Sequence, residues 1–135
     1  MQVIIYTNSN GNVSVCIPSG EIDIEAVKAK DTPQGSVIVD DSQLPQGEDD
    51  FFDAWRLVDG VVSVDIDAAK AITKNRLRFE RAPLMAAQDV LFQRALETNA
   101  DNSAIIAEKQ RLRDITNLAD ACSTTSELRA LKAGV

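Results

Sequence analysis

Histidine is absent from this sequence of 135 residues. Its absence removes the commonest general base, the Ser–His and Cys–His nucleophile pairs, and most zinc sites. The two cysteines, Cys16 and Cys122, cannot build a four-cysteine metal site, and no phosphate-binding loop of the G-x-x-x-x-G-K-[ST] or G-x-G-x-x-G type is present. We therefore expect a protein that is not an enzyme and that has no cofactor and no metal.

Long apolar runs are missing as well. No stretch of about 20 apolar residues occurs, so no membrane span is expected. The first residues, Met1-Gln2-Val3-Ile4-Ile5-Tyr6, lack the basic region and long apolar run of a secretory signal. A single, widely spaced cysteine pair is typical of two reduced, buried thiols in a cytosolic protein. Aromatic residues are few, so any core must be mostly aliphatic.

The charge is divided between the two halves of the chain. Residues 1–67 hold 13 acidic and 3 basic residues, a net charge of −10, whereas residues 68–135 hold 8 acidic and 11 basic residues, a net charge of +3. The change in charge coincides with a change from strand-like to helix-like patterns. An acidic protein has no general affinity for nucleic-acid phosphates, so nucleic acid is not an expected partner.

The first half predicts two hairpins and a short helix. Strands are expected over 3–7 and 13–17, with Asn10-Gly11 supplying the positive φ angles of a tight turn. Asp23 is a candidate N-cap for a helix that ends near Lys30, and a third strand follows over 36–39. An irregular acidic surface loop is expected over 40–50. A second hairpin is predicted around Asp59-Gly60, between strands over 55–58 and 61–65.

The second half predicts helices. Asp67 is expected to cap a helix that runs to Thr98, with a kink or a break at Pro83 and an apolar stripe of Leu84, Ala87, Leu91 and Ala95. A helix capped by Asn102 or Ser103 follows as far as Ile115, with a stripe of Ile105, Leu112 and Ile115, and the short connection favours an antiparallel hairpin. Thr124-Thr125-Ser126-Glu127 is a capping-box pattern before a short helix that ends near Gly134.

The predicted fold class is therefore α+β. A small N-terminal unit over 1–66, a ββαβ arrangement with a second β-hairpin, is followed over 67–135 by an antiparallel helical hairpin and a short C-terminal helix. The acidic stretch 40–53 lacks the D-x-D-x-D-G spacing of a calcium loop, so a solvated loop is expected there.

Two groups of residues are candidates for binding a partner. Phe51, Phe52 and Trp55 form the densest aromatic cluster; either Trp55 and one phenylalanine fill the join between the two halves, or one or more of the three is exposed as an anchor for a partner. The second group is a basic helical face formed by Lys70, Lys74, Arg78 and Arg81, with Arg76 pointing elsewhere. This face is either a solvated surface that also pairs with the acidic half, or an electrostatic seat for an acidic partner such as another copy of the chain.

Several stretches carry a resemblance to a known group of proteins. They are Asp53-Ala54-Trp55-Arg56-Leu57, Arg81-Ala82-Pro83-Leu84, Phe92-Gln93-Arg94-Ala95-Leu96, the run from Ile106 to Ile115, Glu127-Leu128-Arg129-Ala130-Leu131, and the opening Ile4-Ile5-Tyr6-Thr7. Together they resemble small proteins of the tail modules of tailed bacteriophages and prophages, usually described as tail-associated or tail-fibre-associated. The resemblance implies a role in virion structure or assembly and supplies no catalytic residues.

Three functions remain open on this basis. The first is a non-catalytic virion structural or tail-assembly protein that forms homo-oligomers and contacts other tail or fibre proteins, first in the host cytoplasm and then in the virion. The second is a transient tail-fibre assembly chaperone that is absent from the mature virion. The third is an acidic inhibitor that mimics DNA, although the net positive charge of the helical half argues against it.

Overall fold

The computed structural model describes residues 1–134 and confirms the α+β class, with two small antiparallel sheets followed by helices. The chain forms two compact units, Met1–Ala69 and the part from Lys70 onward, which we call unit 1 and unit 2. The division lies inside the first helix of the predicted helical half. Val135, the last residue of that predicted half, lies outside the described residues.

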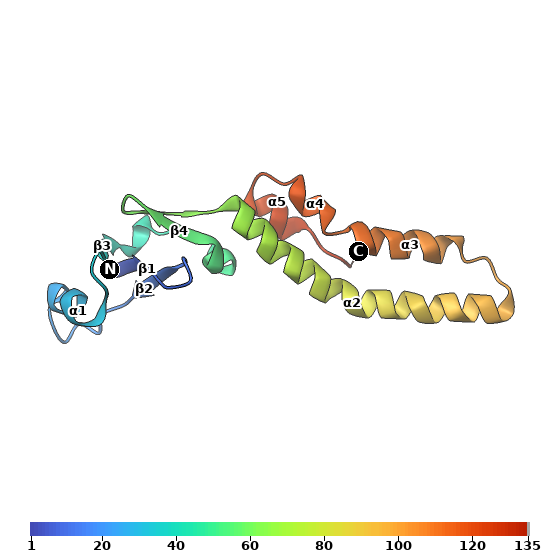
Figure 1. Ribbon diagram of the computed structural model, residues 1–135, viewed down its shortest axis with the longest axis horizontal. Coiled ribbons are helices and arrows are strands. Elements are labelled where there is room, and N and C mark those ends of the chain that lie inside the picture. Colours follow the sequence, from blue (N-terminus) through green and yellow to red (C-terminus); the bar gives the residue numbers. More distant parts are fainter. Residues whose placement is uncertain (135) are drawn as a thin grey trace. The chain divides into compact units, whose positions relative to one another are not determined.

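The larger sheet of unit 1 has β1 (Gln2–Thr7) at its centre. β2 (Val13–Cys16) and β3 (Val37–Asp40) pair with it on either side, both antiparallel (Figure 1). Alternate residues of a strand point to opposite faces, so Val3 and Ile5 share one face and Ile4 lies on the other. All three are buried, which shows that both faces of β1 are covered.

The connection between β1 and β2 is wider than predicted. It spans five residues, Asn8–Asn12, and the backbone N–H groups of Asn10 and Asn12 both donate to the side-chain oxygen of Asn8, at 3.0 and 3.1 Å. Gly11 has a φ of 82°, whereas Asn10 has no positive φ. The tight Asn10-Gly11 turn was therefore wrong in detail, because the Asn8 side chain holds a longer loop in place.

Helix α1 (Ile24–Asp31) packs against β1 and buries Val27. Asp23 occupies the N-cap position as predicted, but its side chain makes no capping hydrogen bond. Instead, its carbonyl accepts from the N–H groups of Ala26 and Val27. The acidic stretch that follows β3 is more regular than predicted, since it contains the 3₁₀ turns η1 (Asp41–Gln43) and η2 (Asp49–Ala54).

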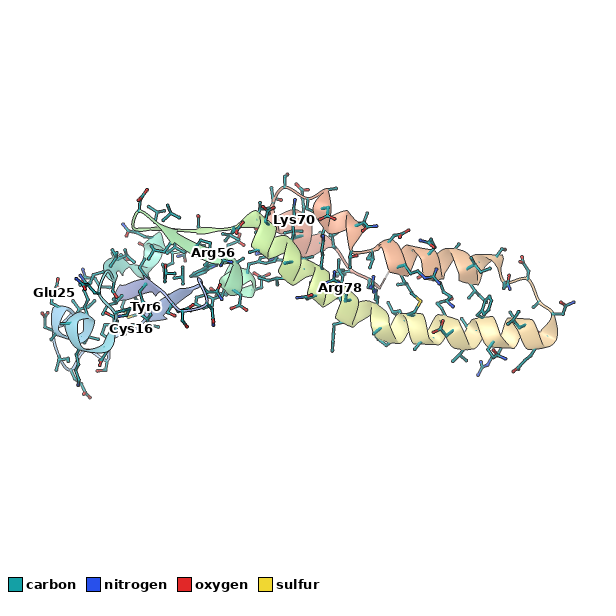
Figure 2. The ribbon with its side chains drawn as sticks, in the orientation of Figure 1. Tyr6, Cys16, Glu25, Arg56, Lys70 and Arg78 are labelled. Carbon is teal, nitrogen blue, oxygen red and sulfur yellow. The ribbon has the colours of Figure 1, made fainter. Side chains whose placement is uncertain are left out.

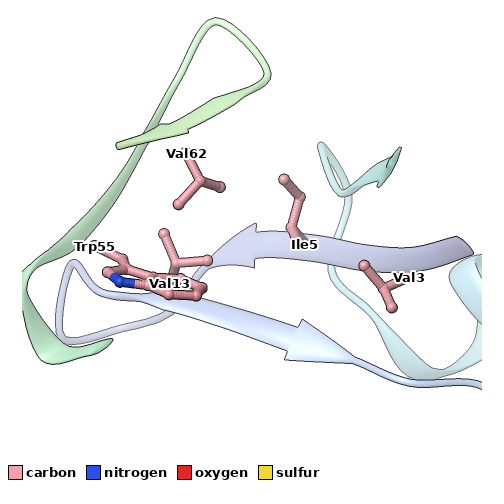
Figure 3. Close-up of a cluster of buried hydrophobic side chains, with 5 residues drawn as sticks. All are labelled: Val3, Ile5, Val13, Trp55 and Val62. Carbon is pink, nitrogen blue, oxygen red and sulfur yellow. The ribbon is translucent and has the colours of Figure 1, made fainter. Parts of the chain in front are cut away.

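The second hairpin forms as predicted. β4 (Trp55–Val58) pairs antiparallel with β5 (Val61–Val64), and the two connecting residues, Asp59 and Gly60, have φ values of 52° and 78°. Two successive positive φ angles are the signature of a two-residue type I′ turn. The hairpin contributes Trp55 and Val62 to the main core of unit 1, which they share with Val3, Ile5 and Val13 (Figure 3).

Helix α2 (Ile66–Thr98) begins two residues earlier than predicted. Its cap is Asp65 rather than Asp67, because Asp65 Oδ1 accepts from the N–H of Asp67 at 3.1 Å. The helix continues through Pro83 as one element and changes direction where its ribbon passes from green to yellow (Figure 1). Of the two predicted outcomes, the structure therefore has the kink: proline has no N–H to donate to the carbonyl of Phe79.

A turn at Asn99 reverses the chain and lets α3 (Ser103–Asp114) run back beside the second part of α2 (Figure 1). Asn99 has a φ of 53°, and the N–H groups of Asn99 and Ala100 donate to the carbonyls of Leu96 and Ala95. This is a Schellman motif with asparagine in the left-handed position. Asn102 occupies the N-cap position of α3 without a capping bond, and the neighbouring Asp101 accepts from the N–H of Ser103 instead.

Two short helices complete unit 2. α4 (Asn117–Asp120) was not predicted, whereas α5 (Thr125–Ala130) follows the predicted capping box: Thr124 Oγ1 accepts from the N–H of Glu127 at 3.2 Å. α5 ends at Ala130, before Gly134, because Leu131 is extended. The fully buried large side chains of unit 2 are Leu77, Thr73, Leu112 and Leu128. Among the described residues no helix is long and apolar enough to cross a membrane.

The predicted apolar stripe of α2 was wrong in part. Ala95 is buried and Leu84 half-buried, but Ala87 and Leu91 are exposed. The face that is turned inward is instead formed by Leu77, Leu84, Met85, Gln88, Phe92 and Ala95. The α3 stripe is as predicted, with Leu112 and Ile115 buried and Ile105 half-buried.

Candidate interaction surface

The aromatic cluster of unit 1 divides into buried and exposed members. Trp55 and Phe51 are buried, and Trp55 Nε1 donates to the carbonyl of Glu48 at 3.2 Å. Phe52 keeps 37% of its surface exposed, and its ring lies 4.9 Å from that of Trp55 between centroids. The structure therefore places Trp55 in the core of unit 1 and leaves Phe52 as the accessible member.

Most of the predicted basic face is engaged within unit 2. Lys70 Nζ donates to the carbonyl of Asp120 at 3.2 Å, and Lys74 Nζ lies 2.6 Å from Asp120 Oδ1. In Figure 2 Lys70 lies at the start of α2. Arg81 donates to the carbonyls of Leu112 and Arg113, at 3.2 and 3.0 Å. These acceptors belong to the last turns of α4 and α3, where helix carbonyls lack intrahelical partners and the helix dipole favours cations.

Arg76 has the same role at α5. It donates to the carbonyls of Leu128 and Leu131, at 3.1 and 2.8 Å, and to Glu80 at 2.7 Å. The lysine contact holds the pKa of Asp120 below its ordinary value. The N–H of Ala133 and the guanidinium of Arg76 do the same to the pKa of Glu80. Hydrogen bonds and ion pairs from basic side chains of α2 thus hold α3, α4 and α5 against α2.

Arg78 is the exception within the predicted basic face. Its side chain is exposed and donates to Asn75 on the same helix at 2.9 Å. Of the four basic residues predicted to bind a partner, Arg78 is therefore the one that faces outward.

The sequence interpretation missed an apolar face on the outside of α2. Phe79 is 84% exposed and Val90 is 50% exposed. The spacing from Phe79 to Pro83, Ala86 and Val90 is four, three and four residues, which places them on one side of a helix, opposite the buried Leu77 and the half-buried Gln88. With Ala82 and Ala87, which are also exposed, they form what we call the outer apolar face. The spacing was visible in the sequence, but α2 has apolar residues on two sides, and only packing shows which side is covered.

One flank of this face carries charges of both signs. Arg78 and Asp89 line the same open depression, together with Ala82 and Ala86 of the outer apolar face. Asp89 Oδ1 lies 2.7 Å from Lys109 Nζ of α3, yet 57% of the Asp89 side chain is exposed. Lys109 also lies 5.0 Å from the centre of the Phe92 ring, a cation–π contact between the two helices.

The part of the α2–α3 hairpin beyond Met85 has few buried side chains. Side chains from both helices fill the space between them in Figure 2. Beyond Met85, however, α2 buries only Ala95 among its described residues, and Leu91, Leu96 and Ile106 are exposed. Exposed apolar side chains therefore lie on more than one side of the hairpin, and Leu91, Leu96 and Ile106 are not part of the outer apolar face.

The two cysteines are free thiols. Cys122 is buried as expected and donates to the carbonyl of Leu118, whereas Cys16 is only half-buried. Within residues 1–134 no group of three or more cysteine, aspartate or glutamate side chains is placed to hold a metal ion. No protein-family model, no curated protein and no solved structure matches this chain.

Proposed function

We propose that this chain is a non-catalytic virion structural or tail-assembly protein of a tailed bacteriophage, and that it acts through protein–protein contacts made by the outer apolar face of α2. The observation that carries the proposal is the exposure of Phe79, at 84%, in a continuous row with Pro83, Ala86 and Val90. Large contiguous apolar patches on a protein surface mark binding sites for other proteins, and exposed aromatic residues supply much of the binding energy.

The packing of α2 against the C-terminal helices supports the proposal. On its inner side, α2 is held by Arg76 and Arg81, which donate to carbonyls of α5 and α3. A helix fixed in this way presents its outer side chains with little loss of conformational freedom on binding. The resemblance of the chain to tail-module proteins supplies the setting: assembly in the host cytoplasm, followed by incorporation into the tail.

The proposal is tested by mass spectrometry of particles purified from the phage or induced prophage that encodes the chain. We expect the chain at a constant ratio to the tail proteins. If particles assemble only when the chain is produced but do not contain it, the chain is a transient assembly chaperone. If normal tails form in the absence of the chain, both the structural role and the chaperone role are refuted.

Variants locate the contact surface. Phe79→Ser should reduce incorporation of the chain by about thirtyfold, the equivalent of a 2 kcal/mol hot spot, and Val90→Ser should reduce it by less. The matched control is Ile106→Ser on α3, because Ile106 is 50% exposed like Val90 but lies outside the outer apolar face. Equal losses for Ile106→Ser and Val90→Ser would show that a different surface makes the contact.

A further inference from the structure

We propose that the outer apolar face binds a second copy of this chain, with the two α2 helices antiparallel about a twofold axis that passes between Pro83 and Ala86. The inference rests on the proposed function only in assigning a contact role to the same face. It is carried by two features of α2: the order of its apolar residues and the position of its exposed charges.

The apolar residues are ordered symmetrically about one point. Phe79 and Val90 lie equally far from the midpoint between Pro83 and Ala86. When two such helices cross antiparallel about that midpoint, the Phe79 of each copy meets the Val90 of the other, and Pro83 meets Ala86. A large side chain then faces a medium one at both ends, and the small central residues allow the helices to approach closely. A twofold interface requires a surface that is complementary to itself, and this order provides one.

The charges follow the same symmetry. Arg78 and Asp89 lie on the same flank of the outer apolar face, where both line one depression. Arg78 lies two positions farther from the same midpoint than Asp89, an offset of about 3 Å along the helix that the long arginine side chain can span. In the antiparallel pair the Arg78 of each copy therefore reaches the Asp89 of the other. The contact joins opposite charges twice. In a parallel pair the flank with Arg78 and Asp89 would lie on opposite sides of the contact in the two copies, so neither charge would gain a partner across it.

The size of the face sets the strength of the association. Six residues on one helix bury less than the roughly 800 Å² per partner of a standard stable interface. We therefore expect a monomer–dimer equilibrium with a dissociation constant of about 10 µM or weaker. Copies that are held side by side on a repeating platform would associate much more strongly, because their effective concentration is high.

The first test is sedimentation equilibrium of the full chain, from about 10 µM to about 1 mM. We expect a reversible dimer that Phe79→Ser weakens by about tenfold or more and that Ile106→Ser leaves unchanged. A wild-type chain that stays monomeric at the highest concentration would overturn the inference. So would equal effects of the two substitutions, because Ile106 lies outside the proposed contact.

The second test separates antiparallel from parallel packing. Arg78→Asp and Asp89→Arg each place like charges at both contacts of a dimer, so each variant alone should dimerise about tenfold more weakly than the wild type. In an equimolar mixture both contacts again join opposite charges, and a heterodimer should form with near wild-type affinity. A mixture that stays as weak as its components would overturn the antiparallel register.

The second test requires that the charge-reversal variants fold like the wild type. Asp89 also pairs with Lys109 in its own chain, so the helical circular dichroism of each variant must match that of the wild type. The milder pair Arg78→Gln and Asp89→Asn serves if Asp89→Arg disturbs the hairpin. Each variant alone should weaken the dimer by about threefold, and their equimolar mixture should recover part of that loss, because the heterodimer keeps one of the two contacts between Arg78 and Asp89. A monomeric wild type whose Phe79→Ser variant is still lost from particles would refute self-association and leave the proposed function standing. If the chain dimerises but tails form normally without it, the proposed function is refuted and self-association stands.

Discussion

The carboxylate of Glu80 accepts a hydrogen bond from the backbone N–H of Ala133 at 3.1 Å, although 53 positions separate the two residues. Arg76 donates to the same carboxylate and also to the carbonyls of Leu128 and Leu131. The middle of α2 is thereby connected to the chain that follows α5. Ala133 is fully buried, so its N–H would have no easy replacement partner.

Glu80→Ala should lower the free energy of unfolding of unit 2 by about 1–2 kcal/mol. A hydrogen bond to a charged group contributes more than this when buried, but the Glu80 side chain is about one-third exposed and solvent screens part of the effect. Urea denaturation followed by helical circular dichroism measures the change. The control is Glu97→Ala, because Glu97 is exposed on the same helix and its hydrogen bond from Gln93 is long, at 3.4 Å. We expect less than about 0.5 kcal/mol for that variant. Equal losses would contradict the role of Glu80.

Unit 2 should lose stability in acid. The pKa values of Glu80, Glu108 and Asp120 lie below their ordinary values of 4.5, 4.5 and 3.8, because Ala133 N–H with Arg76, then Arg111, then Lys74 stabilise the respective carboxylates. The contribution of these three carboxylates to the stability of the folded unit is fully present above their ordinary pKa values. It is lost as the pH falls through their lowered pKa values. The melting temperature should therefore stay level from pH 7 to about pH 5 and fall below about pH 4.5.

Glu80→Gln identifies one contributor to this pH dependence. The variant should melt at a lower temperature than the wild type at pH 7. The difference should shrink as the pH falls below about 4.5 and through the lowered pKa of Glu80, because the wild-type carboxylate is increasingly protonated there. A difference that is the same at every pH would show that the lowered pKa of Glu80 does not contribute to stability.

Gly60→Ala should destabilise the β4–β5 hairpin by about 1–2 kcal/mol. Gly60 has a φ of 78°, a conformation in which a Cβ atom is strained. Open space surrounds the position, so the cost is conformational rather than a clash. The fluorescence of Trp55, the single tryptophan, reports on this unit during denaturation. Gly134→Ala is the control, because Gly134 also has open space but no positive φ, and it should have no effect on that signal. An unchanged midpoint for Gly60→Ala would contradict the turn assignment.

Local signals were sufficient to predict much of the fold. Asp59-Gly60 predicts its turn because few residue pairs accept two positive φ angles, and Thr124 with Glu127 predicts the start of α5 through their mutual hydrogen bonds. Pro83 predicts that α2 is either bent or broken there, because proline lacks a backbone donor. Each of these depends on atoms within a few residues of one another, so the sequence contains the full cause.

The candidate site depends on contacts that no local pattern contains. Lys74 and Arg81 form a basic face in the sequence, yet their partners are Asp120 and the end of α3, and only the folding back of the C-terminal helices brings these together. α2 carries apolar residues on two sides, and the position of α3 decides that Leu77 is buried while Phe79 remains exposed. The sequence by itself determined the turn at Asp59-Gly60, the start of α5 and the interruption of α2 at Pro83. Tertiary packing decided which charges are neutralised internally and which apolar side of α2 stays exposed, because burial is a property of neighbours and not of residues.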